Sequence, residues 1–384
     1  MRRYMSLFSR LPNLIKSGLG LVACLVPFLA GGCRKEQTSG PAERPARREP
    51  WPAISTEEAG LDGTRLDAFA KAIGGHGVVI RQGARAYHWG TPDKPLDIAS
   101  ASKAVYSFLV LKAVEEGRIP SLDQPVVEWM PELGRLNPAL NHKDSRITWR
   151  HLITQTSCYG VSEEPGSAFD YNDYQTGLLY QLIFEKVYKT PGPAGIDTLK
   201  RELFDVIQVT RKPTLRAMTS NGILCRLVIS PLDLARFGHV FLNDGKWKDR
   251  QVISPAHVAL VRGSPHPFSL PRTSGKDAEM LPGAPSYGGG KNQDDHLGCY
   301  SHMWWLNKRD RKGNLLFPSA PEDAFAAIGY GGEKVLMVVP SLDLIVSWNT
   351  DSLTRAPMLS IGREQMESVL KILFSAVKQP AGKN

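Results

Sequence analysis

Cysteine is scarce in this sequence: there are five in 384 residues, and no two form a Cys-x-x-Cys pair. A disulfide-knotted scaffold and a zinc site built from cysteine pairs are therefore excluded. Cys24 and Cys33 fall in an N-terminal segment with the features of an export signal. Only Cys158, Cys225 and Cys299 then remain for the folded part, and three cysteines can form at most one disulfide.

Common cofactor motifs are also missing. The sequence has no His-Glu-x-x-His, no Walker A loop and no Gly-x-Gly-x-x-Gly after a strand. We therefore expect no metal, nucleotide or dinucleotide cofactor. No repeat with a period of 20 to 50 residues is visible, so a solenoid or propeller is not expected.

The folded part of the chain lacks a concentration of charge of one sign. The formal charge is +9, but the first 32 residues contain four basic side chains and no acid, and residues 33–52 contain five basic and three acidic side chains. About three dispersed positive charges remain for the rest. Because nucleic-acid-binding proteins usually carry a basic patch, we expect no nucleic-acid partner.

The N-terminus follows the plan of a secretory signal, with a basic start and an uncharged, mostly apolar run at 18–32. Fifteen residues are too few to span about 30 Å of hydrocarbon as a helix. The run ends Leu29-Ala30-Gly31-Gly32-Cys33, which resembles a bacterial lipobox, where small residues precede a cysteine that is acylated and becomes the mature N-terminus. The alternative is an ordinary signal peptide with an incidental cysteine.

Residues after Cys33 are rich in Pro, Arg, Glu, Ser and Gly and predict a disordered tether. We therefore expect a lipoprotein signal peptide at 1–32, a tether at 33–52 and one folded domain at 53–380. Lipidation at Cys33 predicts an exported protein of the cell envelope. Its lipid would anchor it to a bacterial membrane, facing the periplasm or the exterior.

Apolar periodicity predicts strands near both ends of the folded part. Runs at 78–81 and 85–89 form one expected hairpin, and runs at 334–339 and 344–348 form another with a turn at 340–343. Helices are expected at about 61–73, 101–116, 174–187, 230–243 and 366–377, the first of them capped by Ser55 to Glu58. The helix at 101–116 is apolar nearly all round, so it should lie in the middle of the protein.

These elements predict an α/β fold, more closely an α+β sandwich. An antiparallel sheet is expected from both chain ends, about 53–99 and 300–380, flanked by helices. A mainly helical lobe should come from about 100–260, and 263–298 is expected to be an irregular loop because it has no periodicity.

The search for a nucleophile finds Ser-x-x-Lys three times: at Ser100 and Lys103, at Ser368 and Lys371, and at Ser375 and Lys378. The last two pairs fall on the polar side of the expected C-terminal helix, so we interpret them as solvated surface. Ser100 is different because it precedes a buried helix. It could be a simple N-cap, but a lysine one turn further along a buried helix needs a polar cavity.

The chemistry of that pair favours acyl transfer. Residues three apart on a helix project from one face with Cβ atoms about 5–6 Å apart, so the amine can reach the hydroxyl. Burial lowers the pKa of a lysine and lets it accept a proton or tune a neighbouring phenol. The helix N-terminus offers N–H groups that stabilise negative charge on a carbonyl oxygen under attack.

The segment from Asp97 to Lys103 resembles the Ser-x-x-Lys segment of class C β-lactamases and their relatives: esterases, D-amino-acid-specific peptidases and 6-aminohexanoate-oligomer hydrolases with a penicillin-binding fold. Four later stretches resemble the same family in the same order. They are 147–157 (similar to ITVRHLLTHTSG), 165–173 (PGxxFxYSN), 233–245 (DLARFG…NDG) and 329–332 (GxGG).

The resemblance covers about residues 53 to 380 and implies a β-lactamase-like serine hydrolase acting on a small-molecule ester or amide. It implies Ser100 as the nucleophile, Lys103 as its proton-handling partner and Tyr171 as the second-motif tyrosine. In the family this tyrosine helps to deprotonate the serine and later activates the deacylating water. A phenol can do this only if nearby cations lower its pKa from about 10.

Two departures from the family pattern bear on substrate. The second motif usually reads Tyr-x-Asn, but here Asp173 takes the last position, where a carboxylate can hold Lys103 charged and favour the tyrosine as base. The third motif commonly begins with Lys or His, but here it begins with Tyr330 if Tyr330-Gly331-Gly332 is the right register. Without that cation, we rank ester or amide hydrolysis above β-lactamase activity.

Several further residues are candidates for the substrate site. Gly331 and Gly332 permit close backbone approach and are expected to flank the second oxyanion donor. A strand is expected at 302–305, from which Trp305 or Trp304 contacts the acyl group or packs in the core. His151 is interpreted as a structural histidine rather than a base.

Tyr287 and the glycines at 288–290 form either a lid or an exposed disordered segment. Two alternatives to the main interpretation stay open: a β-lactamase or D,D-carboxypeptidase, and a non-catalytic binding lipoprotein that retains the fold. The oligomeric state and the natural substrate are not readable from the sequence.

Overall fold

The computed structural model describes residues 51–217, 224, 226–283, 294–350 and 361–378, and side chains only from 363 in the last range. The predicted signal peptide, Cys33, nearly all of the tether, Cys225 and the segment 287–290 lie outside the described residues. None of the described helices has both the length and the apolar character needed to cross a bilayer.

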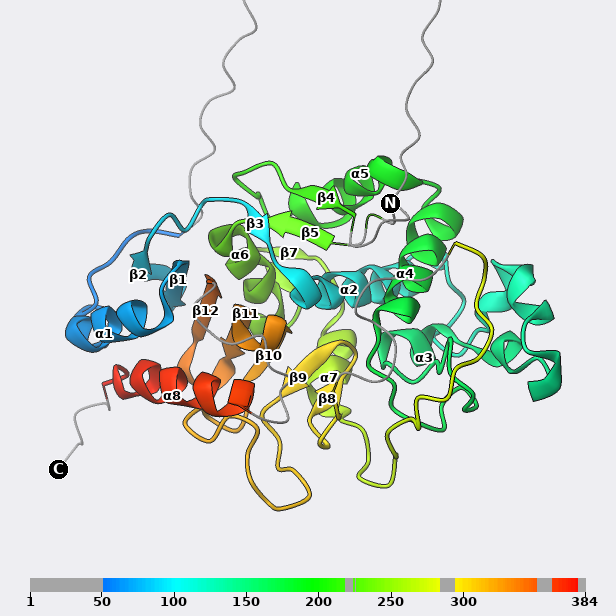
Figure 1. Ribbon diagram of the computed structural model, residues 1–384. Coiled ribbons are helices and arrows are strands. Elements are labelled where there is room, and N and C mark those ends of the chain that lie inside the picture. Colours follow the sequence, from blue (N-terminus) through cyan, green and yellow to red (C-terminus); the bar gives the residue numbers. More distant parts are fainter. Residues whose placement is uncertain (1–50, 218–223, 225, 284–293, 351–360, 379–384) are drawn as a thin grey trace, which may run out of the picture. The chain divides into compact units, whose positions relative to one another are not determined.

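A seven-stranded sheet forms the centre of the described part (Figure 1). Its order is β2-β1-β12-β11-β10-β9-β8, and every neighbouring pair is antiparallel. The strands are β1 (His76–Arg81), β2 (Ala84–Trp89), β8 (Tyr300–Ser301), β9 (Trp304–Leu306), β10 (Phe325–Gly329), β11 (Lys334–Val339) and β12 (Leu344–Asn349). Because β1 pairs with β12, both chain ends build one sheet, as the sequence predicts.

The two predicted hairpins form where the turn residues allow them. Gln82 and Gly83, between β1 and β2, have φ of 51° and 69°, the left-handed pair that joins twisted strands tightly. Asp343, before β12, has φ of 45°. Aspartate tolerates this conformation better than most residues, so the chain reverses at 340–343 as expected.

Both faces of the sheet are covered, because the side chains of each strand alternate between two apolar cores. Val78 and Ile80 of β1 pack in one core with α2 (Ser102–Glu115) and α6 (Pro231–Leu242). Val79 packs in the other core with α1 (Gly63–Ile73) and α8 (Ile361–Ser375). Figure 1 shows α1 and α8 together on one side of the sheet and α6 on the other.

The central helix is buried as its composition predicts: from Ser102 to Leu111 every residue of α2 is buried. The first helix starts later than expected. Ser55 and Glu58 do exchange backbone-to-side-chain hydrogen bonds, but they close a turn, and α1 is capped instead by Asp62, whose carboxylate accepts from Arg65 N at 3.1 Å.

The middle of the chain is less purely helical than predicted. It contains a small sheet, β3 (Leu96–Asp97), β5 (Arg226–Ile229) and β4 (Thr214–Arg216), and a hairpin of β6 (Lys246–Trp247) and β7 (Arg250–Gln251). Helix α6 packs on the main sheet: a Cβ at Gly238 would lie 2.7 Å from Leu336. These strands have two to four residues each, too short for a periodic signal.

The other helical elements of the described part are shorter. The α-helices are α3 (Trp149–Ile153), α4 (Asp173–Tyr180), α5 (Gly195–Leu199) and α7 (Pro255–Gly263), and π-helical turns follow α4 at Gln181–Val187 and α5 at Lys200–Phe204. The 3-10 turns are η1 (Ala99–Ala101), η2 (Val126–Glu128), η3 (Pro131–Arg135), η4 (Pro138–Leu140), η5 (Lys143–Arg146), η7 (Gly192–Ala194), η9 (Tyr330–Gly332) and η10 (Pro340–Leu342).

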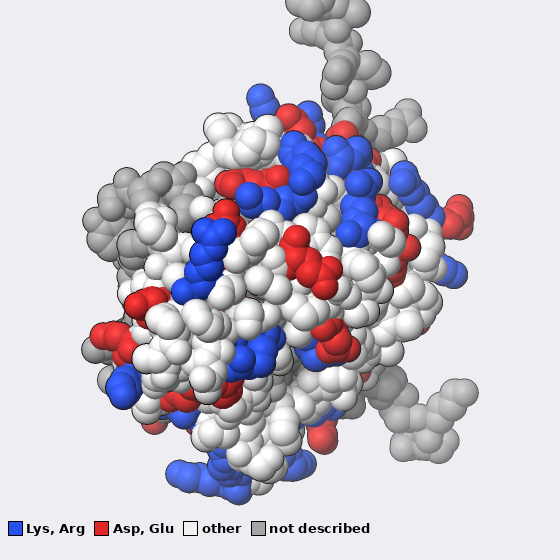
Figure 2. All heavy atoms as spheres, turned by 90° about the vertical axis from the view of Figure 1, so that its right-hand side faces the viewer, with Lys and Arg blue, Asp and Glu red and all other residues white. Residues whose placement is uncertain are grey.

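Figure 2 shows basic and acidic side chains interspersed over one face of the molecule.

Candidate active site

The turn that carries Ser100 is held in an unusual backbone conformation. Ser100 lies in η1, directly before α2, and is partly exposed. Ala99 has φ of 50°, which is uncommon for a residue with a Cβ. Asp97 stabilises this conformation, since its Oδ1 accepts from Ala99 N at 2.8 Å. The serine is therefore presented at the start of a buried helix by a turn that other contacts enforce.

Lys103 lies one turn further along the same face and contacts Ser100 directly. Its Nζ donates to Ser100 Oγ at 3.0 Å and to Asp173 Oδ1 at 2.9 Å. The Lys103 side chain is 4% exposed and that of Asp173 15%. The predicted pair is therefore in hydrogen-bond contact, and the aspartate that departs from the family pattern forms an ion pair with the lysine.

Tyr171 completes this group. Its ring centroid lies 4.8 Å from Lys103 Nζ, and its hydroxyl is hydrogen-bonded with Ser100 and with Lys103. Behind it, Tyr300 lies 5.9 Å and Trp305 6.2 Å away between ring centroids. The phenol thus faces the serine from an aromatic wall, and the structure brings all three predicted catalytic side chains together.

Electrostatics decide between the two possible protonation schemes. Burial disfavours the charged form of Lys103, but Asp173 and Tyr171 more than offset this and raise the pKa of the lysine above its ordinary value. The expectation of a lowered lysine pKa is therefore wrong, because it considered burial without the carboxylate. The departure at Asp173 does hold Lys103 charged.

The expected lowering of the tyrosine pKa is also wrong. Burial raises the pKa of Tyr171, and the nearby Asp294 and Asp173 add to this. The charge of Lys103 and the hydrogen bond with Ser100 act in the opposite direction but do not reverse it. In the resting site, the lysine is an ammonium and the tyrosine a neutral phenol.

Helix α4 positions the second motif. Asn172 is its N-cap, with Oδ1 accepting from Gln175 N at 3.0 Å, and Asp173 is its first residue. A carboxylate in the first turn of a helix is favoured by the helix dipole. The same helix start therefore fixes Asp173 toward Lys103 and Tyr171 toward Ser100.

The third-motif segment approaches Ser100 through a glycine that the sequence analysis did not select. A Cβ at Gly329, the last residue of β10, would lie 2.4 Å from Ile98 O and 3.3 Å from Ala101 N. Only glycine fits there, although its φ of −123° suits any residue. Gly329 belongs to the matched Gly-Tyr-Gly-Gly stretch, but the expected register began one residue later.

The three predicted third-motif residues follow directly after this contact. Tyr330 is one of the two most exposed large apolar side chains in the described part, at 36%, and has φ of 46°. Gly331 has φ of 62°, and Gly332 is buried with its carbonyl accepting from Trp348 Nε1 at 2.8 Å. The segment therefore turns tightly beside the nucleophile turn.

A cation missed by the sequence analysis lies beside Tyr330. The guanidinium carbon of Arg226, on β5, is 4.9 Å from the Tyr330 ring centroid, and Arg226 Nε donates to Asp97 Oδ1 at 3.0 Å. Nothing in its local sequence marks this arginine. Its position depends on the pairing of β5 with β3, across about 130 residues of chain.

The two tryptophans have different places. Trp305 is 3% exposed and stacks edge to face on Tyr300, so it supports the wall behind Tyr171. Trp304 packs in the other core against Phe237 and Phe241. The strand expected at 302–305 begins only at Trp304, because His302 and Met303 have positive φ and form the turn between β8 and β9.

His151 lies in a capping box: Thr148 N donates to its Nδ1 and His151 N donates to the Thr148 hydroxyl, both at 3.2 Å. This fits the structural role expected for it. The two other Ser-x-x-Lys pairs are exposed, as the helical wheel predicts: Ser368, Lys371 and Ser375 lie on α8, and Lys378 follows its end. Ser368, for example, donates only to a backbone oxygen of its own helix, that of Gln365.

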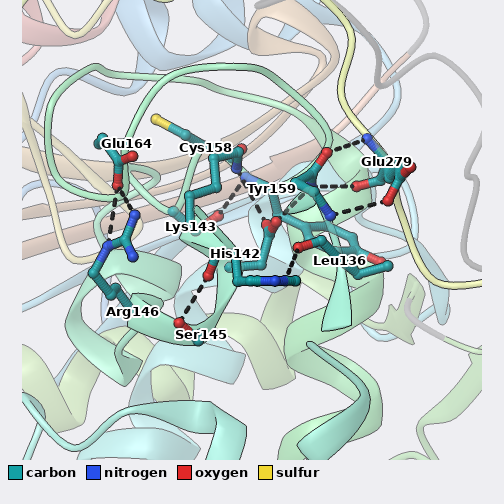
Figure 3. Close-up of polar contacts among 12 residues, drawn as sticks. Leu136, His142, Lys143, Ser145, Arg146, Cys158, Tyr159, Glu164 and Glu279 are labelled. Atoms are coloured by element: carbon teal, nitrogen blue, oxygen red, sulfur yellow. Dashed lines mark hydrogen bonds and ion pairs between the residues drawn. The ribbon is translucent and has the colours of Figure 1, made fainter. Parts of the chain in front are cut away.

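Part of the irregular stretch at 263–298 is pinned beside the segment that carries Tyr171. Phe169 N donates to Pro271 O, and Ala278 N donates to Gly160 O. Asn137 and Glu279 exchange three hydrogen bonds, and Asn137 also binds Asp144, which pairs with the fully buried Lys143 (Figure 3). Lys143 in turn donates to Cys158 O at 2.8 Å. The described loop is therefore fixed to the protein by a buried polar network.

The described residues contain no cluster of three or more His, Cys, Asp or Glu side chains that could hold a metal ion. Cys158 and Cys299 are both buried and form no disulfide with each other.

The fold and the arrangement of serine, lysine and tyrosine are those expected of a β-lactamase-like serine hydrolase. A family model described as Beta-lactamase matches residues 58–210, which include Ser100, Lys103 and Tyr171. No curated protein matches the chain.

Solved structures share the fold at low sequence identity. A Bacillus anthracis protein described as a 6-aminohexanoate-dimer hydrolase has a TM-score of 0.60 at 15% identity, covering 85% of this chain and 87% of that one. A penicillin-binding protein homologue from Caulobacter crescentus has a TM-score of 0.56 at 14% identity, covering 83% of this chain and 99% of that one. A class C β-lactamase from Rhodobacter sphaeroides has a TM-score of 0.54 at 15% identity, covering 81% of this chain and 99% of that one.

The Beta-lactamase family model thus matches the part of the chain that carries Ser100, Lys103 and Tyr171, and the solved structures share the fold of the chain. The predicted fold class, an antiparallel sheet from both chain ends with helices around it, is confirmed.

Proposed function

We propose that this protein is an exported serine hydrolase that cleaves an ester or amide bond through an acyl-enzyme on Ser100. The observation that carries the proposal is the contact of Lys103 with both Ser100 Oγ and Asp173, with Tyr171 hydrogen-bonded to the same serine. This arrangement places a nucleophile, a fixed cation and a proton acceptor within direct reach.

Acylation begins when Ser100 Oγ attacks the substrate carbonyl. In the reactive form Tyr171 has lost its proton to solvent; it takes the proton of Ser100 and gives it to the leaving group as the C–O or C–N bond breaks. Lys103 stays protonated, since Asp173 holds its charge, and its field stabilises negative charge on the tyrosine oxygen. In deacylation a water attacks the ester carbonyl, its proton passes to Tyr171, and Ser100 leaves with a proton.

Backbone N–H groups are the proposed stabilisers of the oxyanion. One is that of Ser100 at the start of the helix, and the other is that of Tyr330, which follows the close contact of Gly329 with the nucleophile turn. Fixed donors aimed at the developing charge are worth about 3–4 kcal/mol each in serine hydrolases. Their geometry depends on how tightly β10 lies against η1.

An ester or amide remains the preferred substrate over a β-lactam. The third-motif segment offers the phenol of Tyr330 where the family commonly has a lysine or histidine, and the nearest cation found there, Arg226, is already hydrogen-bonded to Asp97 and Tyr330. A substrate carboxylate would compete with these partners.

Export and lipidation at Cys33 belong to the same proposal and rest on the sequence alone. If they hold, labelled palmitate will be incorporated into the protein in cells, Cys33→Ser will abolish this, and Cys24→Ser will not. Incorporation into the Cys33→Ser variant would contradict the anchor.

The proposed activity is tested by covalent labelling of the serine and by turnover of model substrates. Purified protein lacking residues 1–33 is treated with a fluorophosphonate probe and assayed with p-nitrophenyl esters and with nitrocefin. We expect one adduct, absent in Ser100→Ala but present in Ser368→Ala, which removes the serine of a Ser-x-x-Lys pair on the exposed side of α8. Well-folded protein that neither forms the adduct nor turns over an ester overturns the proposal, and faster turnover of nitrocefin reverses the substrate ranking.

A further inference from the structure

Two left-handed residues with side chains frame the nucleophile. Ala99 precedes Ser100 and has φ of 50°, and Tyr330 follows Gly329 and has φ of 46°. Gly329 lies against the backbone of 98–101, so the two turns touch each other. Each such conformation costs about 1–3 kcal/mol and persists only where surrounding contacts enforce it.

One side chain reaches the contacts that hold both turns. Arg226 Nε donates to Asp97 Oδ1, and the same carboxylate oxygen accepts from Ala99 N. The other end of Arg226 is hydrogen-bonded to the Tyr330 hydroxyl, and its guanidinium lies 4.9 Å from the centroid of that ring. Both flanking turns are thus linked through one guanidinium.

Arg226 is largely buried and lies on a strand that is bonded to the Ser100 segment, so its side chain can form a rigid link between the two turns. The side chain is 17% exposed, and β5 is hydrogen-bonded to the nucleophile segment through Ile98 N and Leu227 O at 3.1 Å. The planar guanidinium can bind a carboxylate and stack on an aromatic ring at the same time, which a lysine cannot do. The link is therefore held at its base by the small sheet.

Two like charges lie close together in the small sheet, and their repulsion has to be offset by a neighbouring carboxylate. Arg226 and Arg216 lie directly opposite each other on β5 and β4, and like charges in that position destabilise a sheet. Asp97 offsets this by pairing with both, at 3.0 Å and 3.1 Å. Arg216 is 59% exposed and ends at Asp97, whereas Arg226 continues to Tyr330.

We propose that Arg226 is a positioning residue that clamps the Asp97–Ser100 turn to the Tyr330 turn and so sets the distance between the two backbone donors of the oxyanion. The inference rests on the proposed acyl-transfer function. Because the oxyanion forms only in the transition state, loss of the clamp lowers kcat and the rate of serine acylation far more than it raises KM.

The test compares Arg226→Met with Arg216→Met, its matched control, which shares Asp97 but not Tyr330. With a p-nitrophenyl ester, Arg226→Met is expected to lower kcat about 10- to 100-fold and to change KM less than about 3-fold. Arg216→Met is expected to change both less than about 3-fold. Added methylguanidinium should restore part of the kcat of Arg226→Met, which a loss of folding would not allow.

A second pair of variants keeps the test valid if Arg226→Met folds poorly. Arg226→Lys and Tyr330→Phe each loosen one end of the clamp, and the double variant is expected to lose no more kcat than the worse single one. If the losses of kcat in Arg226→Lys and Tyr330→Phe instead multiply in the double variant, the proposed clamp is wrong. It is also wrong if Arg226→Met raises KM at constant kcat or keeps its kcat within about 2-fold of wild type. Absence of turnover in the wild-type protein instead overturns the proposed function.

Discussion

Lys103 and Asp173 form a nearly buried ion pair, with Nζ and Oδ1 2.9 Å apart, and the same ammonium donates to the hydroxyl of Ser100. The pair sets the protonation state of the whole site. Because the carboxylate keeps the lysine charged, the proposed reaction uses the lysine as a fixed cation and the tyrosine as the proton acceptor.

Substitution of Lys103 tests both its role in the reaction and its contribution to the stability of the protein. Lys103→Met is expected to lower kcat about 1,000-fold or more, since both the serine and the tyrosine lose their cation. It should also destabilise the protein by about 3 kcal/mol, because Asp173 is left without its partner at a position only 15% exposed. Steady-state kinetics and urea unfolding measure the two effects.

The double variant Lys103→Met, Asp173→Asn separates them. It should recover most of the lost stability, since no unpaired carboxylate remains, and none of the activity. Recovery of activity in the double variant would show that Lys103 contributes only by satisfying Asp173.

The pH dependence of the reaction follows from the raised pKa values. A base whose pKa lies above its ordinary value is deprotonated only at alkaline pH, so kcat/KM should still rise above pH 9. Asp173 raises the pKa of Lys103 and also that of Tyr171. Asp173→Asn should therefore move the rising limb to lower pH, because Asp173 raises the pKa of the proposed base, Tyr171. A pH profile with an activated ester measures this, and an unchanged or alkaline-shifted limb contradicts it.

The contact between Ser100 and Lys103 was predictable from sequence because it is local. Ser100 and Lys103 are three residues apart on a helix whose burial shows in its composition, and their contact needs no tertiary information. Tyr171 required the family resemblance, and its ion-pair neighbour Asp173 came with it. The lowered pKa values expected for the lysine from burial and for the tyrosine from nearby cations are wrong, because only the packed structure fixes the balance of burial against partners, whereas the expectation that Asp173 holds Lys103 charged agrees with the structure.

The rest of the site depends on strand pairing over long distances. Arg226 reaches Asp97 only because β5 pairs with β3, and Gly329 reaches 98–101 only because β10 ends at the nucleophile turn. Neither residue stands in a periodic pattern, and the strands of the small sheet are too short to give one. The hairpin at 334–348, in contrast, is long enough to be predicted almost to the residue, and the amphipathic helix expected at 366–377 forms as α8, which begins five residues earlier.

Substitution of Gly329 tests the close approach of β10 to the serine. Alanine suits its backbone conformation, but the added Cβ would lie 2.4 Å from Ile98 O. The end of β10 must then shift and move the Tyr330 N–H away from the carbonyl oxygen. We expect Gly329→Ala to lower kcat about 100-fold or more and to lower Tm by a few degrees.

Gly263→Ala is the matched control, because a Cβ at the end of α7 meets nothing within 4 Å. It should leave kcat and Tm close to the wild-type values. Full activity of Gly329→Ala would show that the oxyanion site does not need this contact.

Asp170, which precedes Tyr171 in the chain, predicts how the stability of the protein varies with pH. It is fully buried, Asn172 donates to its Oδ2, and its Oδ1 has no hydrogen-bond partner among the described residues. Burial, with the charge of Glu163, raises its pKa to about 7, although Asn172 and Lys143 act in the opposite direction. In the unfolded chain it ionises near pH 4, so its contribution to stability is complete below that pH and is lost as the pH rises to about 7.

Replacing this carboxyl by a neutral amide should remove that loss. Asp170→Asn is therefore expected to have a Tm several degrees above wild type at pH 8 and a smaller difference at pH 5, while exposed Asp249→Asn follows wild type at both. Thermal melts followed by circular dichroism at the two pH values measure the difference. A wild-type Tm that falls no more steeply with pH than that of Asp170→Asn would mean that Asp170 is already ionised in the native protein at low pH, held by Lys143 and Asn172.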